Sequence, residues 1–284
     1  MFSSKQKIYL SLLLLLGLSA LGAAAIFWLR DYRAATEVVF LNVGEGDAIF
    51  ISQGSNQLLI DGGRTGRELL ARVGRHMPFW DRTIETVIAT HPDADHIGGF
   101  VSLLSAYRVE TFLSTGAESD TETFKLLEAA LSRNALSPLR IFRGGSVRFP
   151  EGGELDIEYP LTPLPEEMKE TNAGSIVARF TYGATSILLT GDLPAEETVL
   201  PDIRPADILK VAHHGSRYST SDAFLDRLQP REAVISVGKN SYGHPNPDVL
   251  RRLEEHHTLI RRTDTGGDIR YLCTAALGRC VFAE

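Results

Sequence analysis

Histidines and aspartates gather at four places in this 284-residue chain, and each place follows a short apolar run. In chain order these residues are His91, Asp93, Asp95 and His96 after "TVIA", Asp192 after "ILLTG", His213 and His214 after "ILKVA", and His244 shortly after "AVISVG". Short apolar runs rich in β-branched residues predict strands. Functional side chains are commonly held on loops at strand ends. The chain is therefore expected to present these clusters from the ends of strands.

The rest of the body alternates apolar runs with amphipathic segments. We predict strands, hairpins and helices over the following ranges: strands at 38–43, 47–52, 57–60, 84–90, 206–216 (running into a His-rich loop) and 233–238, a hairpin at 175–192, and helices at 66–77, 97–107 and 248–256. Two sets of strands interleaved with helices predict an α/β fold with sheets packed face to face and helices outside. Residues 160–170 contain three prolines and are expected to form a mobile loop.

The N-terminal segment differs from the body. Ile8 to Leu29 carries no charge, and as a helix it would span ~33 Å, enough to cross a bilayer core. We predict a single-pass membrane anchor over residues 1–33, with Trp28 at the membrane interface. The remaining residues, 34–284, are expected to form one large domain outside the cytoplasm. The alternative is a signal peptide cleaved near "LGAAAI", but the apolar run continues past that point.

Charge and cysteine content set wider bounds. The net charge of −7 argues against a surface that is basic throughout, although a local basic groove stays compatible with it. Cys273 and Cys280 flank a Gly-containing loop and are consistent either with a disulfide in an exported domain or with two buried thiols.

The residue types in the clusters indicate metal binding. Imidazole and carboxylate are ligands for zinc, manganese or iron, and a carboxylate such as Asp192 can bridge two ions. Two ions ~3.5–4 Å apart can activate a water and polarise a phosphoryl or carbonyl oxygen. Taken alone, Asp192 could instead cap a helix beginning near Pro194, and His76, His256 and His257 read as turn or helix-end residues.

The motif "THPDADHIGG" resembles the H-x-H-x-D-H signature of the metallo-β-lactamase superfamily, and more closely the β-lactamase-like domain of ComEC-type DNA-uptake proteins. The stretches that carry this resemblance, in order, are "FLNVGEGDAIFI", "LLIDGG", "THPDADHIGG", "NAGSIVARFTYGATSILLTGD", "ADILKVAHHGS", "STSDAFLDRLQPREAVISVGKNSYGHPNPDVLRRL" and "RTDTGGDIRY". They cover most of the body. The resemblance implies a four-layer αββα sandwich with two divalent metal ions, zinc or manganese, between the sheets.

The resemblance also implies a role for each matching residue. The first ion would be held by His91 and Asp93 with His213 or His214, the second by Asp95, His96 and His244, with Asp192 bridging. Asp61, in "LIDGG", would support the metal loop without being a ligand. The expected catalytic residues are Asp95 and, if it is not a ligand, His214.

The chain departs from the wider superfamily at two positions. Asp93 replaces a histidine, and Asn172 stands near where many members have another; both fit the ComEC-type branch. Asp93 adds a hard oxygen ligand, which should make manganese more competitive with zinc. ComEC proteins also carry many membrane helices that form a DNA channel. The resemblance therefore implies only the hydrolase domain for this chain. Passage of DNA through the membrane would need a separate channel protein as a partner.

Three functions follow as expectations. The first is a membrane-anchored phosphodiesterase or nuclease acting on DNA, with Lys210, Ser216, Arg217 and Asn172 near the substrate phosphate. The second is a hydrolase of a small phosphodiester or cell-envelope component, similar to phosphorylcholine esterases, and the third is a non-catalytic metal-stabilised DNA-binding module. Two interpretations stay open for a set of four arginines: they line a groove that contacts the DNA phosphates, or they form a solvated surface. The four are Arg251, Arg252, Arg261 and Arg262.

Overall fold

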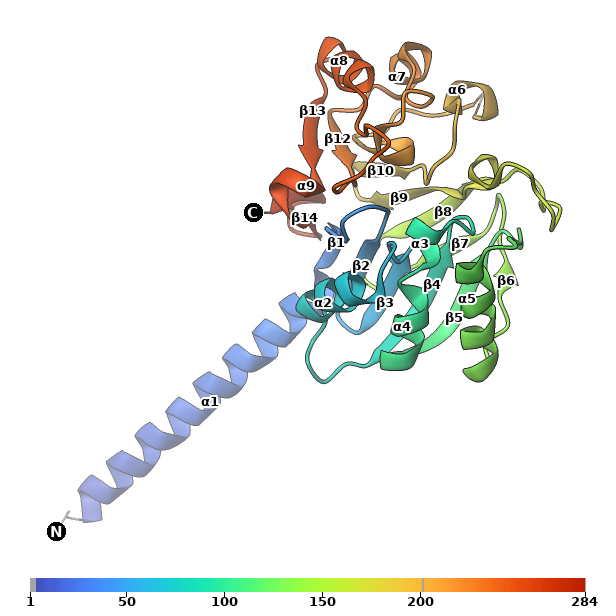
Figure 1. Ribbon diagram of the computed structural model, residues 1–284. Helices are drawn as coiled ribbons and strands as arrows, with labels where there is room; N and C mark the ends of the chain where they lie inside the picture. Colours follow the sequence, from blue (N-terminus) through green and yellow to red (C-terminus); the bar gives the residue numbers. More distant parts are fainter. Residues whose placement is uncertain (1–3, 201, 284) are drawn as a thin grey trace.

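The computed structural model describes residues 4–200 and 202–283, without the side chains of residues 4, 7, 8 and 25–34. Within this range the body consists of two β-sheets packed face to face, with helices on both outer faces (Figure 1). This arrangement confirms the predicted αββα layers.

The first sheet has eight strands in the order β15-β14-β1-β2-β3-β4-β5-β6. Their bounds are β1 (Thr36–Phe40), β2 (Ile49–Gln53), β3 (Asn56–Ile60), β4 (Thr83–Ala89), β5 (Arg108–Ser114), β6 (Leu139–Arg140), β14 (Ile269–Thr274) and β15 (Arg279–Ala283). Neighbours from β3 to β6 are parallel, so their C-terminal ends share one edge of the sheet. Its outer face is covered by α2 (Gly66–His76), α3 (Ala94–Ile97), α4 (Phe100–Ala106) and α5 (Glu122–Arg133).

The second sheet has seven strands in the order β13-β12-β11-β10-β9-β8-β7. Their bounds are β7 (Ser146–Arg148), β8 (Glu154–Tyr159), β9 (Val177–Tyr182), β10 (Thr185–Leu189), β11 (Ile208–Lys210), β12 (Glu232–Ile235) and β13 (Leu259–Arg262). On its outer side lie α6 (Glu196–Val199), α7 (Asp222–Leu228) and α8 (Pro247–Glu255). Short turns complete the chain: η1 (Thr171–Gly174), η2 (Ala212–Gly215) and α9 (Thr263–Gly266).

The period-two pattern of a strand explains why these runs are apolar throughout. Successive side chains point to opposite faces, so β1 sends Val38 and Phe40 into the core between the sheets and Val39 toward the helices. Both faces of the sheet are therefore buried, and a continuous apolar run is needed in place of an alternating one.

Most predicted elements match the observed ones within a few residues, but the helix predicted over 97–107 is divided. It forms α3 and α4, with Gly98 and Gly99 between them. A Cβ at Gly99 would lie 2.0 Å from the carbonyl oxygen of Gly62, so only glycine allows the metal loop to pack this closely against the end of β3. The proline-rich residues 160–170 form an irregular loop.

The two cysteines form a disulfide, which settles the alternative left open by the sequence. Cys273 of β14 and Cys280 of β15 are directly opposite in an antiparallel pair.

The N-terminal segment forms the long helix α1 (Ser4–Ala34), which projects away from the body (Figure 1). Its described leucines between Leu10 and Leu21 are at least half exposed. In the part of the chain that is described, no helix is both long and apolar enough to cross a membrane. Trp28 and the end of the apolar run fall outside the described side chains, so the anchor stays a prediction.

Candidate metal centre

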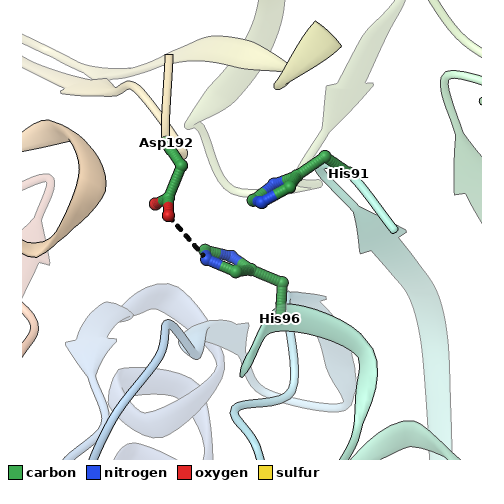
Figure 2. Close-up of side chains that lie close together, drawn as sticks. All are labelled: His91, His96 and Asp192. Carbon is green, nitrogen blue, oxygen red and sulfur yellow. Dashed lines mark ion pairs between the residues drawn. The ribbon is translucent and has the colours of Figure 1, made fainter. Parts of the chain in front are cut away.

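The predicted clusters meet between the two sheets, at the C-terminal ends of the strands that precede them. His91 follows β4 and His96 lies in α3, while Asp192 follows β10 from the second sheet. Figure 2 shows the two imidazole rings and the carboxylate converging. His96 Nε2 lies 3.2 Å from Asp192 Oδ2, and the two rings are 4.1 Å apart between centroids.

His214 enters the same cluster from η2. Its Nε2 lies 3.4 Å from both Asp95 Oδ2 and Asp192 Oδ2. Both His213 and His214 have positive φ values, 50° and 54°, so this turn is held in the left-handed region. Non-glycine residues adopt that region rarely and at a cost, which is commonly met at functional sites.

Hydrogen bonds at the other ring nitrogen orient each of the three imidazoles. His96 Nδ1 is 2.8 Å from Asp61 Oδ2, and His214 Nδ1 is 2.9 Å from the carbonyl oxygen of Ser236. His91 Nδ1 is 3.0 Å from Thr90 Oγ1, which itself donates to Asp61. Because these partners accept from Nδ1–H, the network assigns the free lone pair of each ring to Nε2.

These free lone pairs fit a metal site. Nε2 of His91, His96 and His214, and Oδ1 of Asp192, are buried and make no hydrogen bond of good geometry within the described residues. Buried polar atoms are rarely left without a partner. Four groups of three have ligand atoms within 4.8 Å of one another: His91–His96–Asp192, Asp95–His96–His214, Asp47–Asp192–His214 and Asp47–Asp61–His96. Imidazole nitrogen and carboxylate oxygen suit zinc, manganese or iron.

The electrostatics of the cluster also favour cations. Burial lowers the pKa of His214, but the attraction of Asp192 and Asp47 outweighs it and raises that pKa to about 10. Burial raises the pKa of Asp192, yet His214 and His96 pull it well below its usual value. Burial and repulsion from His96 lower the pKa of His91 to about 3. The centre therefore attracts positive charge, which protons or metal ions can supply.

Asp47 is a member of the centre that the sequence analysis missed. It is buried, with Oδ1 3.4 Å from His214 Nδ1 and Oδ2 3.9 Å from His96 Nδ1. The preceding Gly46 has φ +107°, and a Cβ there would meet the carbonyl oxygen of Asp95 at 1.9 Å. An aspartate at the start of an apolar strand, directly after "GEG", was the available signal.

Lys210 does not occupy the predicted position. We expected it near a substrate phosphate, but its side chain is fully buried and its ammonium contacts the Asp47 carboxylate. The same group donates to the carbonyl oxygen of Gly191 at 2.8 Å and lies 3.7 Å from Asp192 Oδ1. A group enclosed in this way cannot reach a substrate. Its contacts instead compensate the negative charge of the centre.

The expected supporting role of Asp61 matches its contacts. Besides His96, it accepts from the backbone N–H of Thr90 at 2.8 Å. Ser175, which the sequence analysis did not single out, links both halves of the site: its hydroxyl lies 3.3 Å from His91 Nδ1 and accepts from Asp192 N–H at 3.1 Å.

The paired histidines have different positions. His214, and not His213, joins the metal-ligating groups, and it does so beside Asp95 and His96, where we expected His244. His213 is partly exposed, with Nε2 3.8 Å from Asp192 Oδ2. His244 is half-buried with its ring 5.4 Å from that of His213. Because His214 is enclosed among ligands, the alternative role of proton donor does not fit it.

Asp93 and Asn172 lie at the edge of the centre. Asp93 Oδ2 is 3.9 Å from His91 Nε2, while its Oδ1 accepts from Thr171 Oγ1 at 2.6 Å. Asn172 Nδ2 is 3.4 Å from His213 Nδ1, and its buried Oδ1 has no hydrogen-bond partner in the described chain. Asp93 therefore lies beside His91, and Asn172 lies beside His213.

The remaining predicted substrate contacts are used internally. Ser216 is buried, and its N–H donates to the carbonyl oxygen of His213, whereas the Arg217 guanidinium lies over the ring of Tyr218. The four arginines of the predicted phosphate groove contact neighbouring residues: Arg251 pairs with Glu255, Arg252 donates to the carbonyl oxygens of Ser219 and Thr220, Arg261 pairs with Glu232, and Arg262 pairs with Asp264. These contacts favour the solvated-surface interpretation.

Comparison with known families agrees with this geometry. The model of the metallo-beta-lactamase superfamily matches residues 41–239, a range that holds nearly every residue of the centre. The chain belongs to this superfamily. Members of it are generally metal-dependent hydrolases, and the donor set described above is consistent with that class.

Competence proteins are among the curated relatives. The chain is 32% identical over 266 residues to ComE operon protein 3 of Bacillus subtilis, covering 83% of this chain and 33% of that protein. It is 28% identical over 240 residues to Recombination protein 2 of Haemophilus influenzae, covering 82% and 28% respectively. The chain thus spans about a third of the length of these relatives.

A solved structure shares the fold. The metallo-beta-lactamase fold protein YhfI from Bacillus subtilis superposes with a TM-score of 0.54 at 14% identity, over 82% of this chain and 98% of that one. At this identity the likeness concerns the fold alone.

Proposed function

We propose that this chain is a dinuclear metal-dependent phosphodiesterase that cleaves DNA and is held at the membrane by its N-terminal helix. The observation that carries the proposal is the set of three buried imidazole Nε2 atoms, of His91, His96 and His214, that lie around Asp192 and make no hydrogen bond of good geometry within the described residues. The similarity to competence proteins favours DNA over other phosphodiesters.

Two metal positions follow from the donor set. His91 and Asp93 would hold one ion, Asp95, His96 and His214 the other, and Asp192 would bridge them. When bound, the ions supply Lewis-acid polarisation of a phosphoryl oxygen and lower the pKa of water to give a nucleophile at neutral pH. The hard oxygen of Asp93 favours manganese relative to an all-imidazole site.

Charge compensation supports an anionic substrate. The centre holds five carboxylates and one ammonium group, that of Lys210, so its negative charges exceed its positive charge by four. The carboxylates are those of Asp47, Asp61, Asp93, Asp95 and Asp192. Two divalent ions would neutralise this excess, so that a phosphodiester approaching the centre would meet no net repulsion.

The protein's own groups divide the remaining work. Asp61 and Thr90 keep His91 and His96 oriented through their Nδ1 atoms, which limits the reorganisation needed during reaction. His213 and Asn172, on the partly exposed side, would contact the substrate, which their position beside the centre supports.

The test compares the full chain with Asp192→Asn. Both are assayed with zinc, manganese or magnesium on DNA, on bis-p-nitrophenyl phosphate and on a phosphorylcholine ester, with metal content measured in parallel. Loss of DNA cleavage in the variant, and retention in a matched control, Asp222→Asn on α7, are expected. Cleavage of only the small ester would favour the cell-envelope alternative. DNA binding without cleavage under every metal would indicate a binding module.

A further inference from the structure

Two large aromatic side chains are exposed on the loop between α2 and β4. Phe79 is 84% and Trp80 66% exposed, and their rings pack edge to face with centroids 4.8 Å apart. Exposing such large apolar side chains to water is unfavourable. A contiguous exposed apolar group of this kind commonly marks an interaction site.

The loop lies at the edge of the sheet where α1 joins β1. Asp81 accepts from Gln57 Nε2, at the start of β3, at 3.2 Å. Gln53, at the end of β2, donates to Thr36, at the start of β1, at 2.6 Å. With strands ~4.8 Å apart, three steps from β4 to β1 separate the loop from the end of α1 by about 14 Å. Figure 1 shows this loop on the side of the body from which α1 projects.

The metal centre is at the opposite edge. β4 begins at Thr83, just after the loop, and ends at Ala89, just before His91. Seven strand residues span about 20 Å. A surface that contacts the loop therefore leaves the metal centre accessible on the far side.

Two arginines flank the loop, although the whole chain is acidic. Arg75 and Arg82 are both exposed, and Arg75 forms no ion pair within the described residues. The Arg82 guanidinium lies 5.4 Å from the centre of the Tyr107 ring. The carboxylate of the loop itself, Asp81, accepts hydrogen bonds from Gln57 Nε2 and from the N–H of Thr83.

Beside the aromatic pair is an open pocket of about 290 Å³, whose lining includes Phe79, Arg82 and Tyr107. Tryptophan and other aromatic side chains favour the headgroup region of a bilayer, and arginine attracts anionic lipid there. Aromatic groups, cations and an adjacent cavity therefore fit a lipid surface.

We propose that Phe79, Trp80, Arg75 and Arg82 form a second membrane contact, which docks into the headgroup region of an anionic bilayer and holds the metal centre away from it. The inference rests on the proposed N-terminal attachment. Together, the helix and the loop would fix the orientation of the domain at two points about 14 Å apart.

The chain has two tryptophans, Trp28 and Trp80, which allows a direct test. The full chain carrying Trp28→Phe is reconstituted into phosphatidylcholine–phosphatidylglycerol vesicles that contain brominated lipid. Emission from Trp80 is expected to shift to shorter wavelength and to be quenched by the bromine atoms. The shift should shrink in vesicles of phosphatidylcholine alone, because the arginines then lose their anionic partners.

Two further variants of the protein distinguish the possible outcomes. Trp80→Phe leaves Trp28 to report on the helix, and the triple variant Trp28→Phe/Trp80→Phe/Tyr218→Trp reports on the edge of the metal centre, where Tyr218 is 67% exposed. Quenching of Trp28 without quenching of Trp80 would refute the docking surface while leaving the attachment intact, and would point to a protein partner for the loop. No quenching of either would refute the attachment and the inference with it. Equal quenching at position 218 would refute the proposed orientation.

Discussion

Lys210 and Asp47 form a buried ion pair that joins the two sheets beside the metal centre. Lys210 ends β11 of the second sheet, and Asp47 precedes β2 of the first. Burial raises the pKa of Asp47, but Lys210 and His214 outweigh this effect and hold that pKa below its usual value. Burial opposes the charge of Lys210, yet Asp47 and Asp192 raise its pKa. Each charge thus depends on the other.

Removing the amine should be costly because Asp47 would remain as a buried, uncompensated charge. We expect Lys210→Met to lower the free energy of unfolding of the metal-free chain by about 3–5 kcal/mol. The double variant Asp47→Asn/Lys210→Met should lose less, since neither charge remains. Urea unfolding in the presence of a chelator measures both. Equal losses in the single and double variants would argue against the pair.

The two neighbouring histidines should differ in metal binding. His214→Ala removes an Nε2 atom that faces Asp95 and Asp192, whereas His213→Ala removes a ring at the partly exposed edge. Metal content should fall by about half in the first variant and stay near the wild-type value in the second, because a site that loses a ligand binds weakly. Elemental analysis of the purified chains tests this, and the reverse result would show that the turn at η2 is assigned incorrectly.

Asp61 should act through His96 and not as a ligand. Asp61→Asn keeps the size of the side chain but weakens its hold on His96 Nδ1 and on Thr90. Metal affinity is expected to fall about 10–100-fold, as for other partners of ligating histidines. Competition with a chelator measures it, and the exposed Asp226→Asn serves as the control. Unchanged affinity would contradict the supporting role.

Glu196 should make stability depend on pH. Burial raises its pKa from 4.5 to about 7, although both carboxylate oxygens accept from Thr220 N–H. The folded state therefore holds a proton that the unfolded state has released between these two pH values. The stabilisation is complete below about pH 4.5 and is lost as the pH rises through 7, by roughly 3 kcal/mol.

Glu196→Gln removes this titration. The free energy of unfolding of the wild type, relative to the variant, should decrease by roughly 3 kcal/mol between pH 4 and pH 8. Denaturant unfolding at several pH values tests it. Parallel pH profiles for the two chains would mean that Glu196 ionises normally in the fold.

Periodicity and residue type predicted a large part of this protein. The apolar runs predicted β1 to β4 and the β9–β10 hairpin because a strand buried on both faces needs apolar side chains at every position. The density of His91, Asp93, Asp95 and His96 predicted a metal loop, because few other loops require such residues together. Residues 108–159 carried no comparable pattern, and β5 to β8 were not predicted there.

Positions within the centre depended on contacts between distant segments. Asp47 and Lys210 are 163 positions apart in the chain, and their spacing says nothing about their meeting between the sheets. His213 and His214 have the same side chain and adjacent numbers, so only the left-handed turn of η2 decides which of them faces Asp95.

By itself, the sequence determined the layers and the ligand types, because strand periodicity and donor chemistry are local properties of residues. Only the tertiary structure decided which donors share a site, that Lys210 is enclosed and not available to substrate, and that the loop between α2 and β4, where Phe79 and Trp80 are exposed, lies on the side where α1 leaves the body. These features depend on how the two sheets bring distant segments together, and each such contact is set by packing over the whole core.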